Sequence, residues 1–450
     1  MKSTINKILF LTAVAAATLP AFTSCSQDES IDERLSSGAI GFNMVLDHSN
    51  AQNRPTGTRA ASGTTVMDAT SFQNFRVWAY DANVLGTESN SISPGGAMYM
   101  GSTNAAGVLI KRSDNNTTGA NGYQFGTETS GGKYWGYDQV SDVKYWPKNY
   151  LQFFAIGPNG IDNITSYAMP ATYDGTNTFT YTADASDLTK HKDIIVAAKR
   201  QAGTVGNSNV ALTFKHALSQ VIFLGKVTPN QPNLHVRIYS VSVCNVNKTG
   251  TFTFPLETNG DLSTLAQSHW GTLSTPSTYT IQPMSSETTN YIELTANTSD
   301  VTQDGTTYSL MNGGTSDDDK AKDPLFLIPQ TVSAWDYSSN YNDGTKAIVG
   351  GGTNADGQAD GTQTGAYLKI NCAIYQVDGV PIVGSYSAST YTGEDVYVPL
   401  SVNWNPGTKY IYTLQFGIGR NQYGVPLGAP ITFSVSSVTD WTSSPQNVSL

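Results

Sequence analysis

Charged residues are scarce in this sequence. Asp, Glu, Lys and Arg make up 13% of its 450 residues, against about 25% in an ordinary soluble domain. Thr, Ser, Asn, Gly and Tyr take their place, and these residue types favour strands and turns over helices. No stretch has a helical period long enough to connect two parallel strands. The composition therefore predicts an all-β protein, and the length allows two or three domains, of which we expect two.

Clustered positive charge is missing as well. The formal net charge at pH 7 is −10. A sequence-independent contact with the phosphates of a nucleic acid needs grouped Lys and Arg side chains. The charge balance therefore excludes nucleic acid as a partner.

The motifs of catalysis and metal binding are absent too. The five histidines are scattered, and none stands at metal-ligand spacing from another His or a Cys. There is no G-x-S-x-G elbow and no phosphate-binding glycine loop. The loop around Asp356 and Asp360 has oxygen ligands at alternating positions but lacks the Glu that completes an EF-hand, so a solvated loop is favoured over a calcium site. We expect no enzyme, no cofactor and no metal site.

Cysteine is rare, with three in the chain. Cys25 belongs to the N-terminal segment described next, which leaves Cys244 and Cys372 far apart in the body. A disulfide between these two stays open from the sequence alone. Two buried thiols that act as small hydrophobic residues are favoured.

The N-terminus has the pattern of an export signal. Lys2 and Lys7 precede an apolar run over residues 8–19. That run is too short for a membrane-spanning helix, which needs about 20 residues. Residues 1–24 are therefore predicted to be a secretory signal peptide.

The residues around Cys25 add a lipid anchor to this signal. Small residues before a cysteine resemble the lipobox of bacterial lipoproteins, in which the cysteine becomes the lipidated N-terminus. Phe22 stands where that pattern usually has Leu. The acidic stretch 26–30 resembles the surface-export signal of Bacteroides-type lipoproteins. The resemblance implies a tether over 25–38 and a location on the outer face of the outer membrane.

A strand and a protease-sensitive segment follow the tether. Over 39–46 apolar residues recur at every second position, which predicts a strand with one buried face: Ile40, Phe42, Met44 and Leu46. Arg59 is followed by small residues, beginning with Ala60, in a segment predicted to be flexible and exposed. A trypsin-like protease can cleave after an arginine in such a segment. Arg54 is a poorer site because Pro55 follows it.

The rest of the chain consists of strand-sized apolar runs with turn signals between them, which favours β-sandwiches. We expect a pro-segment over 39–59 that contains the first strand, an N-terminal β-sandwich over 60–225 and a C-terminal β-sandwich over 226–450. The stretch 95–132 is rich in Gly, Asn, Ser and Thr and is predicted to be a long loop. Loops of that length are usually functional or mobile.

Three stretches resemble the fimbrillin family, the subunits of type V pili of Bacteroides-type bacteria. They occur in family order and span nearly the whole chain: 142–158 with its Tyr145-Trp146-Pro147 turn, 193–221, and 404–441. The resemblance implies two tandem transthyretin-like β-sandwich domains and export as a lipoprotein. It also implies cleavage after an arginine in the loop behind the first strand, which here matches Arg59.

One cleavage there would detach the subunit from its lipid and also free strand 39–46. Loss of a strand exposes unpaired backbone groups and apolar pockets. A neighbouring subunit can fill the groove by strand addition, and a head-to-tail contact that does not close grows into a filament. The resemblance implies a donor within 431–450. The inserted side chains stay open between two sets: Ile431, Phe433 and Val435, or Val438 and Val448.

The sequence is compatible with two functions. The first is a structural or adhesive pilus subunit whose partners are other subunits, an arginine-specific protease, the outer membrane through its lipid, and a host or glycan receptor. The long loop over 95–132 favours an adhesive role, and stalk against tip stays open. The alternative is a surface glycan-binding lipoprotein that does not polymerise and stacks sugars on aromatic loops such as 134–137.

Overall fold

The computed structural model describes most of the chain body. The described residues are 38–46, 73–82, 96–113, 134–147, 149–202, 209–227, 233–255, 260–262, 264–282, 290–295, 308–311, 324–335, 365–417 and 431–439. Among them the regular structure is β apart from three short 3₁₀ helices, Val140–Asp142, Leu188–Lys190 and Gln267–His269. The prediction of an all-β protein is confirmed. No helix among these residues is long and apolar enough to span a membrane.

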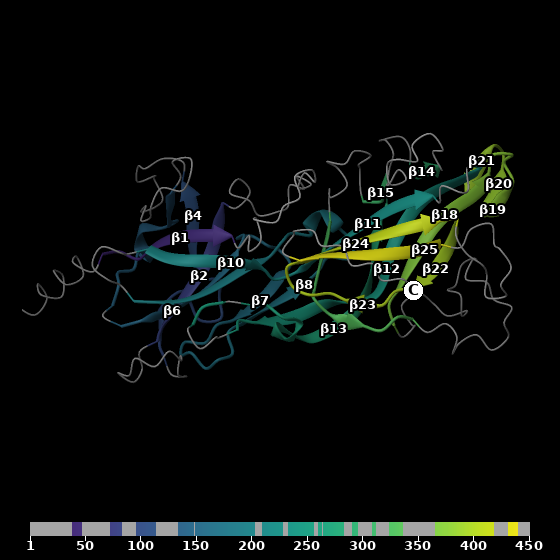
Figure 1. Ribbon diagram of the computed structural model, residues 1–450. Coiled ribbons are helices and arrows are strands. Elements are labelled where there is room, and N and C mark those ends of the chain that lie inside the picture. The colour runs from purple at the N-terminus through teal and green to yellow at the C-terminus, as the bar shows by residue number, and fades with distance from the viewer. Residues whose placement is uncertain are drawn as a thin grey trace, which may run out of the picture.

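The molecule is elongated, with β1 and β4 toward one end and β19, β20 and β21 at the other (Figure 1). The first sheet has eight strands in the order β1-β10-β9-β6-β2-β4-β5, and β3 pairs with β2. Their bounds are β1 (Gly41–Leu46), β2 (Asn74–Asp81), β3 (Met98–Met100), β4 (Val108–Ser113), β5 (Tyr134–Tyr137), β6 (Leu151–Gly157), β9 (Ile195–Gln201) and β10 (Asn209–His216).

Strands β3 and β4 correct the expectation of a long loop over 95–132. Within that polar stretch, two short apolar runs form strands that pair with β2. Strand β4 pairs with the first half of β2, and β3 pairs with its second half. Met100 and Ile110 from these runs are buried. Three apolar residues in a row are enough for a strand when a buried neighbour accepts them, although the surrounding composition is typical of a loop.

The first sheet is covered on both faces. Along β6 every residue is buried, with Phe153 and Ala155 in one apolar cluster and Phe154 and Ile156 in another. A strand covered on both sides shows such a continuous apolar run in its sequence. The first of these clusters is here called the N-terminal core: Ile40, Phe42, Phe75, Val77, Ala79, Met100, Ile110, Trp135, Tyr137, Trp146, Leu151, Phe153, Ala155, Ile195, Ala197, Val210, Leu212 and Phe214.

The other end of the molecule is built from two further large sheets. One has five strands, β15-β11-β24-β25 with β16 beside β11, and the other has eight, β19-β18-β12-β8-β7 with β13 and β14 beside β12 and β22 beside β18. Two-stranded pairs β17–β23 and β20–β21 complete the described part. The bounds are β7 (Ile164–Ala168), β8 (Thr178–Thr182), β11 (Ser219–Val227), β12 (Leu234–Thr253), β13 (Trp270–Ile281), β14 (Ile292–Thr295), β15 (Tyr308–Ser309), β16 (Leu325–Leu327), β17 (Thr331–Val332), β18 (Tyr367–Gln376), β19 (Pro381–Val383), β20 (Ser385–Ser387), β21 (Thr390–Thr392), β22 (Glu394–Pro399), β23 (Val402–Asn403), β24 (Thr408–Phe416) and β25 (Ile431–Thr439).

Strand pairing crosses the boundary expected at residue 225. Strand β11 runs through that position and pairs in parallel with β24. Strands β7 and β8, which precede it in the sequence, belong to the sheet of β12, which follows it. The division into tandem transthyretin-like domains at this residue stays a prediction.

The two cysteines of the body lie on neighbouring strands of the β12 sheet. Cys244 stands opposite Tyr367 and Cys372 opposite Ile238, so they are far apart along the register. Both are buried thiols, and burial raises the pKa of Cys372 well above its ordinary value. The bridge that the sequence left open does not form, because the register separates the two sulfur atoms.

Candidate strand-exchange site

The strand expected over 39–46 is present as β1, which ends the order of the first sheet, and the residues just before it have backbone partners of their own. It pairs in parallel with β10, from Gly41 opposite Asn209 to Leu46 opposite Phe214. On its other side the preceding residues bond to 144–146: the Ile40 N–H donates to the Lys144 carbonyl (2.8 Å) and the Trp146 N–H to the Gly38 carbonyl (3.2 Å). The segment 38–46 therefore links β10 to the residues that follow β5.

The side chains of β1 complete the N-terminal core. Ile40 and Phe42 are 0% and 1% exposed. The ring centroid of Phe42 lies 5.8 Å from that of Phe75, 6.0 Å from that of Tyr137 and 6.2 Å from that of Phe153, and all three contacts are edge-to-face. Aromatic pairs in this arrangement add about 0.5–1.5 kcal/mol to their burial. Phe42 therefore occupies a pocket lined by rings from β2, β5 and β6.

Tyr137, at the end of β5, also binds the backbone of this segment. Its hydroxyl donates a hydrogen bond to the Ile40 carbonyl (2.9 Å). Burial raises the pKa of the Tyr137 phenol far above its ordinary value, so the group keeps its proton at any physiological pH. The phenol is therefore a permanent donor to whichever backbone carbonyl lies in that place.

The chemistry available here is the binding of an extended chain. Without β1, the inward edge of β10 would lose its hydrogen-bond partners, and the N-terminal core would lose Ile40 and Phe42. Burial of each such side chain contributes about 1.5–3 kcal/mol, and an unsatisfied buried backbone group costs about 1–3 kcal/mol. An emptied groove of this kind is unstable unless another strand enters it.

The C-terminal strand that the sequence offers as donor is β25. It pairs antiparallel with β24 over its full length, from Ile431 opposite Phe416 to Thr439 opposite Thr408. In the described part it ends the order of its sheet, so it is bonded along one edge (Figure 1). The predicted donor residues lie on it: Ile431, Phe433, Val435 and Val438. Their role as donors stays a prediction.

Several predicted positions lie outside the described residues. These are the lipidation site Cys25, the cleavage site Arg59 with Ala60, the loop residues Asp356 and Asp360, and Val448. Lipidation, cleavage and calcium binding therefore stay predictions from the sequence.

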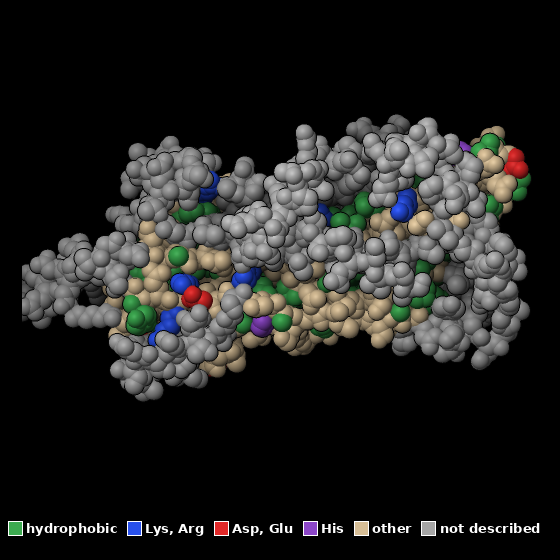
Figure 2. All heavy atoms as spheres, in the orientation of Figure 1, with side chains coloured by type: hydrophobic (Ala, Val, Ile, Leu, Met, Phe, Trp, Pro, Cys, Tyr) green, Lys and Arg blue, Asp and Glu red, His purple; other side chains and the backbone are tan. Residues whose placement is uncertain are grey.

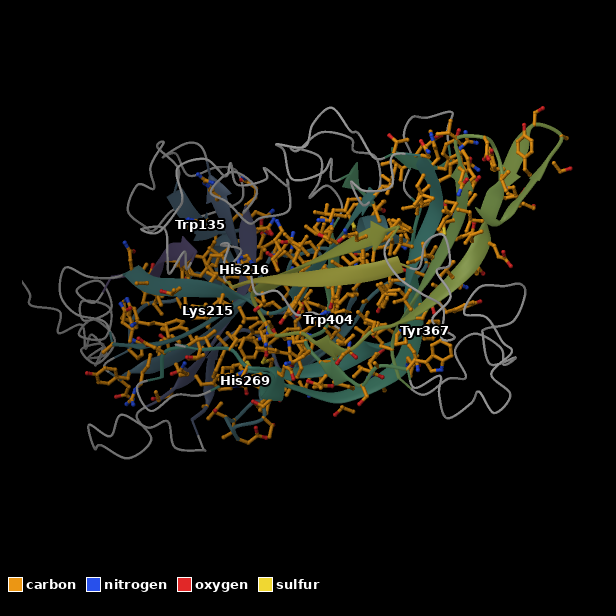
Figure 3. The ribbon with its side chains drawn as sticks, turned by 45° about the vertical axis from the view of Figure 1, so that its right-hand side comes forward. Trp135, Lys215, His216, His269, Tyr367 and Trp404 are labelled. Carbon is orange, nitrogen blue, oxygen red and sulfur yellow. The ribbon has the colours of Figure 1, made fainter. Side chains whose placement is uncertain are left out.

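The aromatic run 134–137 does not form a sugar-binding loop, which corrects the alternative reading of the sequence. Trp135 and Tyr137 are each 2% exposed and belong to the N-terminal core. In Figure 3 Trp135 lies with the strands of the first sheet, away from Tyr367 and Trp404 in the other half. The run forms β5, and both rings point inward because they alternate with residues on the opposite face of the strand.

Charged groups are few at this site. On the visible surface the Lys and Arg side chains are scattered and form no single patch (Figure 2). In the described part of the chain, no group of three or more His, Cys, Asp or Glu side chains is placed to hold a metal ion. The site is thus formed by backbone hydrogen bonds and apolar rings.

A buried His–Asp contact lies at the end of β10, where the chain passes into β11. His216 Nδ1 is 2.6 Å from Asp193 Oδ2, and both side chains are buried. Burial raises the pKa of Asp193, and the nearby His216 opposes that shift. His216 is therefore held by a hydrogen-bonding contact within the folded core.

Sequence reasoning missed the walls of the Phe42 pocket. Phe75, Tyr137 and Phe153 come from three separate stretches of the chain, and no local signal links them. Each lies on a strand-sized apolar run, which predicts a buried strand without naming its neighbours.

Comparison with known proteins gives one family. A family model described as fimbrillin-like matches residues 58–441. A solved fimbrial protein from Bacteroides vulgatus is 14% identical, covering 89% of this chain and 99% of that chain, with a TM-score of 0.46. The fimbrial anchor protein Mfa2 from Porphyromonas gingivalis is 7% identical, covering 89% and 96%, with a TM-score of 0.30. At TM-scores this low, the two structures add nothing to the family match. No curated protein matches the chain.

Proposed function

The chain belongs to the fimbrillin-like family, and from that membership we propose that it is a structural or adhesive subunit of a cell-surface pilus. In this proposal it has no catalytic role, and its partners are other pilus subunits. The observation that supports strand exchange as the means of assembly is the position of the segment 38–46, which closes the N-terminal core with the buried side chains of Ile40 and Phe42.

The proposed life of the subunit begins with lipid attachment at Cys25 and display on the outer face of the outer membrane. A trypsin-like, arginine-specific protease then cuts after Arg59. Because β1 lies between these two residues in the sequence, the cut separates both the lipid and β1 from the body. The mature subunit would begin at Ala60 and reside in the fimbria.

Assembly then proceeds by replacement of β1. Once the 39–59 pro-segment leaves, the edge of β10 and the pocket of Phe42 are open. A C-terminal strand from a second subunit enters and restores both the backbone hydrogen bonds and the buried side chains. The contact is head-to-tail, so each added subunit presents a new donor and the chain of subunits grows.

Limited proteolysis of the purified full chain tests this function. Trypsin is expected to produce a body that begins at Ala60, identified by mass spectrometry, and oligomers that resist dissociation in detergent. Arg59→Ala should prevent both, whereas Arg54→Ala should change neither. A cleaved protein that releases residues 39–59 and stays monomeric would contradict the proposal.

The surface glycan-binding alternative makes the opposite prediction. It requires an intact monomer that binds oligosaccharides, which glycan arrays and isothermal calorimetry measure directly. With Trp135 and Tyr137 buried, the aromatic run that suggested it offers no exposed ring from either residue. An adhesive tip subunit would show both polymerisation and receptor binding.

A further inference from the structure

We propose that the N-terminal core fixes the register of the incoming strand, so that Phe433 of one copy takes the place that Phe42 leaves in the next. The inference rests on the strand exchange proposed above and states which residues meet. It also gives Tyr137 a positioning role. The partner is a second copy of this chain, recognised by an aliphatic residue followed two positions later by an aromatic one.

Two places in the groove select side chains by size and polarity. The ring site, which Phe42 fills, has the rings of Phe75, Tyr137 and Phe153 around it. A smaller residue there would leave a void, and a charged one would lose its hydration among apolar atoms. The second site is aliphatic and holds Ile40, whose side chain is completely buried. Ile40 precedes Phe42 by two residues and lies on the same face of the segment.

The C-terminal strand carries the spacing that these two sites require. The sequence is Ile-Gly-Phe at 40–42, where β1 begins, and Ile-Thr-Phe at 431–433, where β25 begins. Beyond the signal segment, an Ile followed two positions later by a Phe occurs only in these two strands. The next position on the same face is also apolar in both, with Met44 in β1 and Val435 in β25. Strand β25 is therefore a close chemical copy of β1.

Registers that use the later C-terminal residues suit the two sites less well. With Val438 in the aliphatic site, Asp440 would reach the ring site and place a carboxylate among aromatic rings. With Val448 in the aliphatic site, Leu450 would reach the ring site and fill it less completely than a phenyl ring. The groove therefore favours the first of the two donor sets that the sequence left open.

Tyr137 contributes to this selection through two different groups. Its ring is one wall of the ring site, and its hydroxyl binds the backbone carbonyl at the aliphatic site. Every strand has a carbonyl at each residue, so this bond carries no sequence information by itself. The bond positions the backbone, and the pockets around it select the side chains. A strand shifted by one residue would turn its apolar face outward.

The proposed register names the residues that stand side by side. Strand β1 runs parallel to β10 with Phe42 opposite Val210 and Asn43 opposite Ala211. In the exchanged state Phe433 would stand opposite Val210 of the next subunit, and Ser434 opposite Ala211. Ala211 is exposed, so a side chain can be introduced there without disturbing the core.

Disulfide trapping between subunits tests the register. Paired residues on neighbouring strands lie about 5 Å apart, which permits a disulfide, whereas a shift of two residues places them about 8 Å apart, which does not. Full-length protein with Ser434→Cys and Ala211→Cys should form covalent ladders after tryptic cleavage and assembly. The control, Ser436→Cys with Ala211→Cys, should give at least about tenfold less. Cys25 leaves with the cleaved segment, and the remaining two cysteines are buried.

The outcomes separate this inference from the proposed function. Filaments that form but give cross-links only in the offset pair would overturn the register and leave strand exchange intact. Cleaved wild-type protein that never assembles would overturn both. Cross-links in the first pair alone would support both.

Two substitutions test the residues assigned to selection. Phe433→Ala should lower the amount of assembled protein at least about tenfold, while Val438→Ala on the same strand should leave it nearly unchanged. Tyr137→Phe keeps the ring and removes the hydroxyl. It should lower the amount of assembled protein about two- to tenfold, the equivalent of one hydrogen bond, and leave the ratio of in-register to offset cross-links unchanged. An unchanged amount of assembled protein would show that the Tyr137 hydroxyl does not position the incoming strand.

Discussion

Strands β1 and β25 have similar sequences and very different surroundings. Strand β1 runs parallel to β10, and the residues that lead into it bond to 144–146 as well. Strand β25 runs antiparallel to β24 and, in the described part, is bonded along that one edge. The strand near the N-terminus thus closes a core, while the strand near the C-terminus extends the rim of a sheet.

This difference shows that the stability of a strand depends on where the fold places it. An Ile-x-Phe face buried inside a closed core contributes more than the same face at a rim, because the surrounding rings are held in position beforehand. Movement of such a strand from a rim into a core would therefore be favourable even when the number of backbone hydrogen bonds stays the same. The proposed assembly uses this difference as its driving force.

Truncation of Phe42, the residue in the ring site, should have the largest effect on the difference in stability between the two strands. In uncleaved protein, Phe42→Ala should lower the free energy of unfolding by about 3–5 kcal/mol, because it leaves a cavity between three rings. Phe433→Ala is expected to cost clearly less in the same uncleaved protein, since in the described part β25 lacks the further backbone bonds that residues 38–40 make beside β1. Denaturant titrations of both variants give the two numbers, and equal losses would show that the strands do not differ as described.

Removal of the Tyr137 hydroxyl should have a smaller effect on the stability of the N-terminal core. Tyr137→Phe should lower the free energy of unfolding by about 0.5–1.5 kcal/mol, because the Ile40 carbonyl loses its donor while the ring stays in place. The same measurement on Tyr150→Phe, at an exposed ring, serves as the matched control. A loss no greater than that of the control would mean that the bond to β1 contributes nothing.

The smallest expected effect concerns the support of β5. Lys111 donates a hydrogen bond to Asp138, next to Tyr137, and together with Gln139 it holds the pKa of Asp138 below the ordinary value of 3.8. A lowered pKa means that the stabilisation is present above pH 3.8 and is lost as the pH falls through the lowered pKa.

Because the Lys111 side chain is half exposed, solvent screening limits the contribution of this pair to less than about 1 kcal/mol. Asp138→Asn should therefore be slightly less stable than wild type near neutral pH and equal to it in strong acid. Thermal unfolding across this pH range measures the difference. A deficit that persists unchanged in strong acid would assign the effect to something other than the carboxylate charge.

Much of the architecture could be predicted from periodicity. The two-residue alternation over 39–46 correctly predicts strand β1. The scarcity of charge and the abundance of Thr and Tyr indicate an all-β fold. These signals are local, because each depends on which faces of one strand are apolar.

The partners of each strand could not be predicted in the same way. Nothing in the sequence near β1 shows that β10 is its neighbour, because the pairing joins stretches far apart in the chain. The run 134–137 illustrates the same limit: its aromatic residues suit an exposed binding loop as well as a buried strand. They are buried because Phe42 and its neighbours pack against them, and that contact is set by the whole fold.

Hydrogen–deuterium exchange of β10 tests the central claim most directly. In uncleaved protein the backbone amides of 209–214 should be protected by β1. After tryptic cleavage and release of 39–59 they should exchange much faster, and after assembly they should be protected again, while β24 follows a different course. Unchanged protection of 209–214 in the cleaved monomer would contradict the claim that β1 fills a place that another subunit can take.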